Sequence, residues 1–407
     1  MKAEYILKKA NERPGGDLET FLSYVASTLE KKGAIHTATE IARQPALWQK
    51  TYQILREISD ELNIFLSNIY KEENVNILLT GAGTSAFIGE VLQGPYQKYS
   101  GIPVRAVATT DIVTHPDLYF QSQRPTLLIS FARSGNSPES VKAVQLANEM
   151  CKNIYHLIIT CNGQGELAKQ ALGKNSFVFL LPPESNDQSL AMTGSFTSML
   201  LAGILIARLT ELDKLKNQVQ LMAQYGTTVL DKSLNDLRKT ASFNFNRAVF
   251  LGSGLFGGIA RESHLKLQEM SDGRIICKHD SFLGFRHGPK AVITPQTLIV
   301  YLFSNNNYSF NYEKDLLQSV NSGERGMYSV GVMETHHEEL DLDLAIELGD
   351  SAASLDEEFF ALVSVVPAQV LAFFKSLDLG LQPDNPSVSG TITRVVQGVK
   401  IYQYQNM

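Results

Sequence analysis

The chain has 407 residues, of which 44% are hydrophobic and 19% charged, a composition typical of a globular protein with ample material for a core. The formal net charge is −6, which argues against a dedicated nucleic-acid binder. At about 100–200 residues per domain, this length indicates two or three domains.

The cysteines and the apolar segments bear on where the protein works. Cys151, Cys161 and Cys277 form neither a CxxC pair nor an even set, which favours the reducing cytoplasm. The first residues contain no apolar segment of signal-peptide length. The apolar run 199–207 is shorter than the roughly 20 residues that a bilayer requires, so we expect no membrane contact.

The N-terminal part reads as helical, and a different pattern follows it. Residues 17–70 are expected to form helices, with Asp17 as an N-cap and Pro45 at a boundary between two of them. Helical stretches then alternate with short apolar segments, which we interpret as strands at 75–80, 104–108, 126–130, 155–160 and 177–181. Such alternation predicts a mostly parallel sheet covered by helices on both faces.

The pattern then repeats. A strand at 247–251 leads into a second glycine turn, whose Gly252 follows Gly81 by 171 residues. The strand-like segment that begins at Thr297 follows the one that begins at Thr126 by the same offset. We infer two tandem copies of one α/β domain, joined by a helical stretch around residues 200–240. The expected division is a helical lead-in at 1–50, domains at 51–225 and 226–382, and a tail at 383–407.

The third strand of the first copy ends in the hydroxyl-rich stretch SFARSGNS, residues 130–137. It lies at the carboxyl end of a parallel strand and before a helix, where free backbone N–H groups attract anions. Ser134 and Ser137 add hydroxyl donors, Gly135 lets the backbone approach a ligand, and Arg133 adds charge. An N-cap with surface serines is the simpler alternative, although capping needs only one hydroxyl. No P-loop motif occurs.

Two glycine turns leave a second alternative. Residues 81–86 fit G-x-G-x-x-A and residues 252–257 fit G-x-G-x-x-G, each after a strand, as in dinucleotide-binding folds. The acidic residue of that fold should follow about 20 residues later, whereas Asp111, the nearest candidate, comes late. Tight packing of strand against helix explains the same glycines.

Candidate catalytic residues lie after the second glycine turn. Glu262, Lys266 and Glu269 share one helical face, but this spacing alone equally fits a solvated stripe of charges. His287 stands in a loop between Arg286 and a Gly-Pro pair, although a single surface histidine is more often inert. Neither an HExxH motif nor a clustered Cys/His set occurs.

Taken together, SFARSGNS, GAGTS at 81–85, and ESHLKLQEM at 262–270 followed by FRHGP resemble the sugar isomerase (SIS) superfamily. The two tandem domains resemble the isomerase half of glucosamine-6-phosphate synthase, as does the lead-in segment EIARQP at 40–45. The tail NPSVSGTITRVVQGV at 385–399 is most similar to one branch, the galactosamine-6-phosphate deaminase/isomerase family, also called tagatose-6-phosphate ketose/aldose isomerases. The implied fold is two tandem SIS domains, each a flavodoxin-like three-layer α/β sandwich.

The resemblance also implies roles for residues. It assigns Glu269 to proton transfer between C2 and C1 and Lys266 to a place beside it. It assigns His287 to ring opening, and in the synthase the matching histidine comes from a partner subunit. The family's phosphate loop reads S-x-S-G-x-[ST]; Ala132 replaces its first serine here, and Arg133 would compensate. The synthase's tail lysine has no match, which leaves Ser389, Thr391 and Arg394 in its region. The implied substrate- and phosphate-binding residues are Gly83, Thr84, Ser85, Arg133, Ser134, Gly135, Asn136, Ser137, Ser389 and Arg394.

The resulting expectation is a cytoplasmic enzyme that converts galactosamine 6-phosphate into tagatose 6-phosphate and ammonia and needs no metal or organic cofactor. It would act as a homodimer or higher homo-oligomer with shared active sites. Plain aldose–ketose isomerisation of a hexose 6-phosphate, a non-catalytic sugar-phosphate sensor and a dinucleotide enzyme are the alternatives. The sequence does not separate galacto from gluco substrates.

Overall fold

The computed structural model describes residues 19–171, 173–350, 352–396 and 398–404. Its first sheet contains five parallel strands in the order β4-β3-β5-β6-β7. β3 and β5 are buried at every position, as expected of strands covered by helices on both faces. The strands are β3 (Asn76–Thr80), β4 (Val104–Ala106), β5 (Thr126–Ala132), β6 (Ile154–Thr160) and β7 (Ser176–Leu180).

The second sheet repeats this topology. Its strand order is β12-β11-β10-β8-β9. In both sheets the first strand of the copy lies between the second and the third, and the fourth and fifth follow the third. The starts of β8 and β10 follow those of β3 and β5 by 171 residues, so the predicted repeat is confirmed. The strands are β8 (Arg247–Leu251), β9 (Ile276–Asp280), β10 (Thr297–Leu302), β11 (Tyr328–Met333) and β12 (Leu344–Glu347).

The N-terminal part departs from the prediction of helices alone. A small antiparallel hairpin, β1 (Thr20–Phe21) and β2 (Tyr24–Val25), precedes the helices, and the predicted cap Asp17 lies outside the described residues. Its turn residues Leu22 and Ser23 both have positive φ, a local feature that hydrophobic periodicity does not reveal. The helices are α2 (Ala26–Lys31), α3 (Ile35–Ala42), α4 (Gln44–Glu57) and α5 (Ser59–Ile69), and Pro45 stands in the first turn of α4 as predicted.

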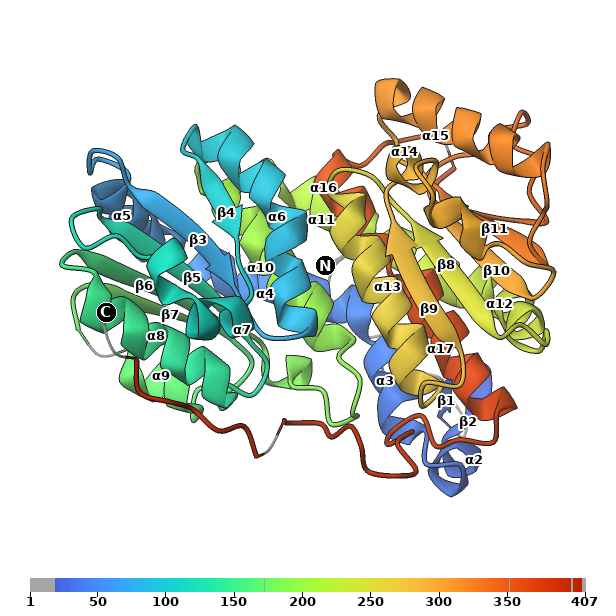
Figure 1. Cartoon of the computed structure of the whole chain (residues 1–407), viewed down its shortest axis with the longest axis horizontal. Coiled ribbons are helices and arrows are strands. Elements are labelled where there is room, and N and C mark those ends of the chain that lie inside the picture. The colour runs from blue at the N-terminus through green and yellow to red at the C-terminus, as the bar shows by residue number, and fades with distance from the viewer. Residues whose placement is uncertain (1–18, 172, 351, 397, 405–407) are drawn as a thin grey trace, which may run out of the picture.

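Helices cover both faces of each sheet (Figure 1). One hydrophobic cluster lies beneath α7 and α8, another beneath α14 and α15, and the largest joins the two sheets through the helices between them. The remaining helices are α6 (Thr84–Ser100), α7 (Thr109–Thr114), α8 (Pro138–Met150), α9 (Glu166–Gln170), α10 (Gly194–Ala207), α11 (Lys216–Lys232), α12 (Leu234–Ala241), α13 (Phe256–Met270), α14 (Phe282–Phe285), α15 (Asn307–Asn321), α16 (Glu357–Val363) and α17 (Val366–Asp378).

Two apolar segments form the middle of the shared core. α10, which contains the apolar run 199–207, is buried from Gly194 to Ile206 and packs against α4 and α6. The stretch Glu357–Asp378 is apolar and long enough by composition to cross a membrane, but 94% of its most apolar window is buried inside the protein. Both segments are therefore core helices of this fold.

Contacts between the two sheets' helices join the copies into one unit. α6 and α13, which follow the two glycine turns, pack against each other. The predicted boundaries at 50/51 and 225/226 fall inside α4 and α11, two of the helices that line the shared core, so the division into domains stays a prediction.

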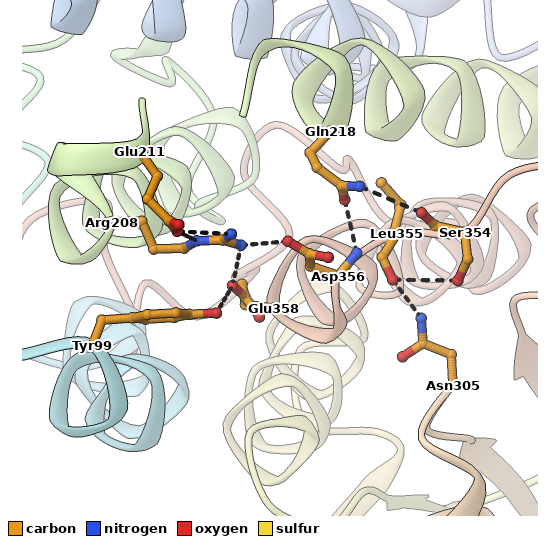
Figure 2. Close-up of polar contacts among 9 residues, drawn as sticks. All are labelled: Tyr99, Arg208, Glu211, Gln218, Asn305, Ser354, Leu355, Asp356 and Glu358. Atoms are coloured by element: carbon orange, nitrogen blue, oxygen red, sulfur yellow. Dashed lines mark hydrogen bonds and ion pairs between the residues drawn. The ribbon is translucent and has the colours of Figure 1, made fainter. Parts of the chain in front are cut away.

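A polar network joins residues of the first copy to residues of the second (Figure 2). Arg208, at the end of α10, pairs with Asp356 and with Glu358 at 2.8 Å, and its guanidinium lies 4.9 Å from the centre of the Tyr99 ring. Asn305, in the loop after β10, donates to the carbonyl of Leu355 at 2.8 Å. The segment 354–358 therefore links the loops of the second sheet to helices of the first copy.

Candidate active site

A cavity of about 320 Å³ opens at the carboxyl ends of the strands of the first sheet. Its lining comes from the first glycine turn, the loop after β5, the loop after β7, helix α13 and the tail. Ten of the thirteen predicted site residues lie on it: Gly83, Thr84, Ser85, Arg133, Ser134, Gly135, Ser137, Lys266, Glu269 and Arg394.

The first glycine turn brings the start of α6 to this cavity. A Cβ atom at Gly81 would lie 2.5 Å from the backbone of Ser85, so the turn requires glycine for close packing. Gly83 has φ of 57° and is followed directly by α6, which places Thr84 and Ser85 in its first helical turn. Backbone N–H groups in that turn lack partners within the helix and are suited to an anion.

The hydroxyl-rich loop provides a second set of donors. Gly135 has φ of 68°, and a Cβ there would lie 3.3 Å from Gly165, so this turn also requires glycine. Ser137 precedes α8 but makes no capping hydrogen bond, which removes the simple N-cap explanation and leaves its hydroxyl for a ligand. Asn136 does not line the cavity, because its side-chain oxygen accepts from the N–H of Glu166 at 3.0 Å.

The charged face of α13 is buried against α6 and is not solvated. Lys266 is almost fully buried, with 1% of its side chain exposed, and its Nζ lies 2.7 Å from Oε2 of Glu269 and 3.4 Å from Oε1 of Glu262. The same ammonium donates to Oγ1 of Thr84 at 3.2 Å. Glu269 keeps 24% of its side chain exposed and lines the cavity, so its carboxylate is held in place and still open to a ligand.

Burial sets the charges of this face. Glu262 is fully buried, and its pKa is raised to about 8, first by burial and further by Glu269, while Lys266 lowers it. Burial by itself would lower the pKa of Lys266, but the neighbouring Glu262 and Glu269 raise it, so the ammonium stays charged. Among the described residues, neither oxygen of Glu262 has a hydrogen-bond partner with good geometry.

The tail crosses from the second domain to the first (Figure 1) and forms one wall of the cavity. Residues 391–396 line it, among them Arg394. Ser389 does not reach the cavity; its hydroxyl lies 2.6 Å from that of Thr391.

His287 does not reach the cavity either. It is exposed in the loop after α14, next to Gly288, whose φ is 114°. Within the described part of the chain, no group of three His, Cys, Asp or Glu side chains has the arrangement to hold a metal ion.

Comparison with known proteins agrees with this arrangement. The SIS domain family model matches residues 69–208. D-galactosamine-6-phosphate deaminase AgaS from Shewanella sp. (strain ANA-3) is 39% identical over 387 residues, which cover 93% of this chain and 95% of that protein. This chain belongs to the AgaS family of SIS-domain proteins.

Solved structures show the same relationship. The crystal structure of tagatose-6-phosphate ketose/aldose isomerase from Escherichia coli superposes with a TM-score of 0.84 at 35% identity, covering 94% of this chain and 99% of that one. The C-terminal domain of glucosamine-fructose-6-phosphate aminotransferase from Francisella tularensis superposes with a TM-score of 0.74 at 18% identity, covering 86% of this chain and 98% of that one. This similarity shows a shared fold.

Several residues at the site of this AgaS-family chain were missed by sequence reasoning. Glu262 was noted on the charged stripe without a role, because spacing does not reveal that the stripe is buried. Leu190 and Met192 line the cavity from the loop after β7. That loop follows the fifth strand of a parallel sheet, and its position at the same edge was the signal that could have pointed to it.

Proposed function

We propose that the protein is a sugar-phosphate deaminase/isomerase that converts galactosamine 6-phosphate and water into tagatose 6-phosphate and ammonia. Its relatives support this reaction, because one is a D-galactosamine-6-phosphate deaminase and another a tagatose-6-phosphate ketose/aldose isomerase. The observation that carries it is the partly exposed carboxylate of Glu269, held 2.7 Å from the Lys266 ammonium. This carboxylate lines the same cavity as the first glycine turn and the hydroxyl-rich loop after β5.

The phosphate group would bind between the first glycine turn and the hydroxyl-rich loop after β5. Ser134 and Ser137 offer hydroxyls, and Thr84 and Ser85 offer further donors at the start of α6. Two helix N-termini, of α6 and α8, lie at this end of the sheet and favour a dianion. Lys266, which lines the same cavity beside Glu269, would add a positive charge near the reacting end of the sugar.

The chemistry moves the C2 proton to C1. Once the ring is open, Glu269 removes the proton from C2, the electrons of that bond form a C1–C2 double bond, and the aldehyde oxygen takes up a proton from water, which gives a C1 hydroxyl beside the C2 amine. Glu269 then returns its proton to C1, the nitrogen gives one proton to water, and the resulting imine at C2 is hydrolysed to the ketone with release of ammonia. The Lys266 ammonium would stabilise the negative charge that develops on the substrate during the first transfer.

Ring opening would use His287 of a second copy, since this histidine is exposed and away from the cavity of its own chain. We therefore propose a homodimer with shared active sites. The three free cysteines support a cytoplasmic location, with Cys151 and Cys161 buried and burial raising the thiol pKa of Cys161 to about 12.

Simple aldose–ketose isomerisation is the second candidate, supported by the similarity to the Escherichia coli tagatose-6-phosphate ketose/aldose isomerase. The same carboxylate and lysine perform both reactions, because the first proton transfer is common to them. The difference is whether C2 of the bound sugar carries an amine or a hydroxyl.

Ammonia release from galactosamine 6-phosphate tests the proposal, with glucosamine 6-phosphate in parallel. We expect ammonia from the galacto substrate, a loss of more than about 10³-fold in kcat for Glu269→Gln, and near-normal turnover for Gln268→Ala, an exposed neighbour on α13. The variant should still bind the substrate, because the phosphate contacts remain.

Other outcomes distinguish the alternatives. Interconversion of tagatose 6-phosphate with an aldose, without ammonia from either amino sugar, would favour the plain isomerase. Tight sugar-phosphate binding with no turnover of any kind would indicate a sensor. Full activity in Glu269→Gln would remove this residue from the mechanism.

A further inference from the structure

The tail is fixed to the protein before it reaches the cavity. Asp384 accepts hydrogen bonds from the N–H and the hydroxyl of Thr37, both at 2.8 Å, and its own N–H donates to Gly33 at 2.9 Å. From there the chain runs beneath α9 at the edge of the first domain (Figure 1). Residues 391–396 therefore bridge from one domain to the other while forming a wall of the site.

Arg133 connects that wall to the first domain. It is only 6% exposed, and its guanidinium donates to the carbonyls of Ser189 at 3.3 Å and Leu190 at 3.2 Å. A further N–H of the same group donates to the backbone carbonyl of Arg394. One side chain therefore joins three backbone oxygens from the loop after β7 and from the tail.

Arg394 makes the reciprocal contact. Its Nε donates to the carbonyl of Asp187 at 2.9 Å, and a terminal nitrogen donates to the side-chain oxygen of Asn186 at 3.0 Å. The two arginines are thus crossed: Arg133 holds the backbone of the tail, and Arg394 holds the loop after β7.

The loop they grip is itself well anchored. The carboxylate of Asp187 accepts from Ser195 N–H at 2.9 Å and Thr193 N–H at 2.8 Å. Glu40 accepts from the N–H of Ser189 at 3.2 Å. A tail tied to this loop is consequently tied to a rigid part of the first domain.

We propose that Arg133 is a positioning residue that holds tail segment 391–396 against the substrate cavity. Arg394 holds the same segment through its contacts with the loop after β7, and we call the contacts of the two arginines the latch. The planar guanidinium fork suits this task, since a lysine ammonium of shorter reach does not span the same three carbonyls. The activity readout of this inference rests on the proposed function, whereas the position of the tail does not. Direct contact of Arg133 with the substrate phosphate is the competing role.

Hydrogen exchange of the tail, followed in the full chain, tests the latch without any turnover. In Arg133→Gln we expect amides of residues 391–396 to exchange at least about tenfold faster, because charge-assisted hydrogen bonds are lost, while amides of β5 are unchanged. Arg124→Gln is the matched control, since Arg124 also donates to two carbonyls, of Asn74 and Val75, away from the cavity. It should leave the exchange of the tail unaltered.

Kinetics separate the two roles of Arg133. For a latch, Arg133→Lys should raise KM nearly as much as Arg133→Gln, by about tenfold, and adding Arg394→Ala should give little further increase because both changes release the same segment. Inorganic phosphate, used as a competitive probe, should keep its inhibition constant within about twofold.

Two results would overturn the latch. Unchanged exchange of the tail in both Arg133→Gln and Arg394→Ala would show that the tail does not depend on the arginines. Normal exchange combined with a rise in both KM and the phosphate inhibition constant, rescued by Arg133→Lys, would assign Arg133 to the phosphate. If the wild-type chain released no ammonia, the proposed reaction would fail while the exchange experiment still decided the latch.

Discussion

Lys266 donates a hydrogen bond to Thr84 over 3.2 Å, and this contact crosses from the second copy of the repeat to the first. The two residues lie on α13 and α6, the helices that follow the two glycine turns. The packing of equivalent helices thereby places the carboxylate face of one copy beside the first glycine turn of the other. One cavity uses both copies.

The first prediction concerns the pH dependence of substrate binding. The pKa of Glu262 is raised to about 8, chiefly by burial, so the carboxyl group keeps its proton at neutral pH and becomes negative above pH 8. A new negative charge beside the cavity disfavours an anionic substrate. We expect KM to rise by about threefold to tenfold between pH 7 and pH 9.

Glu262→Gln should remove this step, because glutamine stays neutral. Measurement of kcat and KM from pH 6 to pH 9 in both proteins checks the expectation. An identical rise in the variant would assign the step to another group.

The second prediction concerns stability. Glu313 is 1% exposed, and its pKa is raised to about 7, first by burial, with Glu357 adding to the rise and the N–H of Ser304 opposing it. The folded state therefore holds this proton more tightly than the unfolded chain between about pH 4.5 and pH 7. The free energy of unfolding should fall as pH rises through that window, by up to about 3 kcal/mol from this group.

Urea unfolding of wild type and Glu313→Gln at pH 5 and pH 8 measures this contribution as the difference between the two proteins. The variant should lose less stability on going to pH 8. Glu324→Gln, at an exposed position, serves as the control and should follow the wild type. Parallel curves for all three proteins would contradict the prediction.

The third prediction concerns the crossing of α6 and α13. A Cβ at Gly258 would lie 2.6 Å from Val91 Cγ2 and 2.9 Å from the backbone nitrogen of Val91. Gly258→Ala should push the helices apart, cost about 1–3 kcal/mol of stability and lower kcat, because Lys266 then moves relative to Thr84. Gly94→Ala, on α6 with open space around it, should be nearly neutral. Thermal unfolding and turnover of both variants check this, and equal behaviour would disprove the role of the close approach.

The fourth prediction concerns the network at the end of α10 (Figure 2). The Arg208 side chain is 12% exposed and pairs with Asp356 and Glu358, so Arg208→Met leaves a carboxylate buried without its cation. We expect a loss of about 3–5 kcal/mol in the free energy of unfolding. Arg56→Met removes the exposed pair with Asp213 and should cost under about 1 kcal/mol. Denaturant unfolding distinguishes them, and similar losses would contradict the argument.

Much of the architecture could be predicted because it depends on local patterns. The strands of the first sheet, and β8 and β10 of the second, were predicted from short apolar segments, and the 171-residue offset identifies the repeat without any knowledge of contacts. The glycine turns and the loop with Ser134 and Ser137 are equally local, since each residue type meets a backbone requirement within a few positions. Their shared location followed from the rule that parallel strands end at one edge of a sheet.

Tertiary packing alone decided the rest. The periodicity that places Glu262, Lys266 and Glu269 on one face is the same for a solvated stripe and for a buried ion cluster, and only the approach of α6 shows which it is. The contact of Arg133 with the tail joins residues 261 positions apart. No local pattern contains such contacts, because they depend on how the two halves of the chain pack and on which groups that packing removes from water.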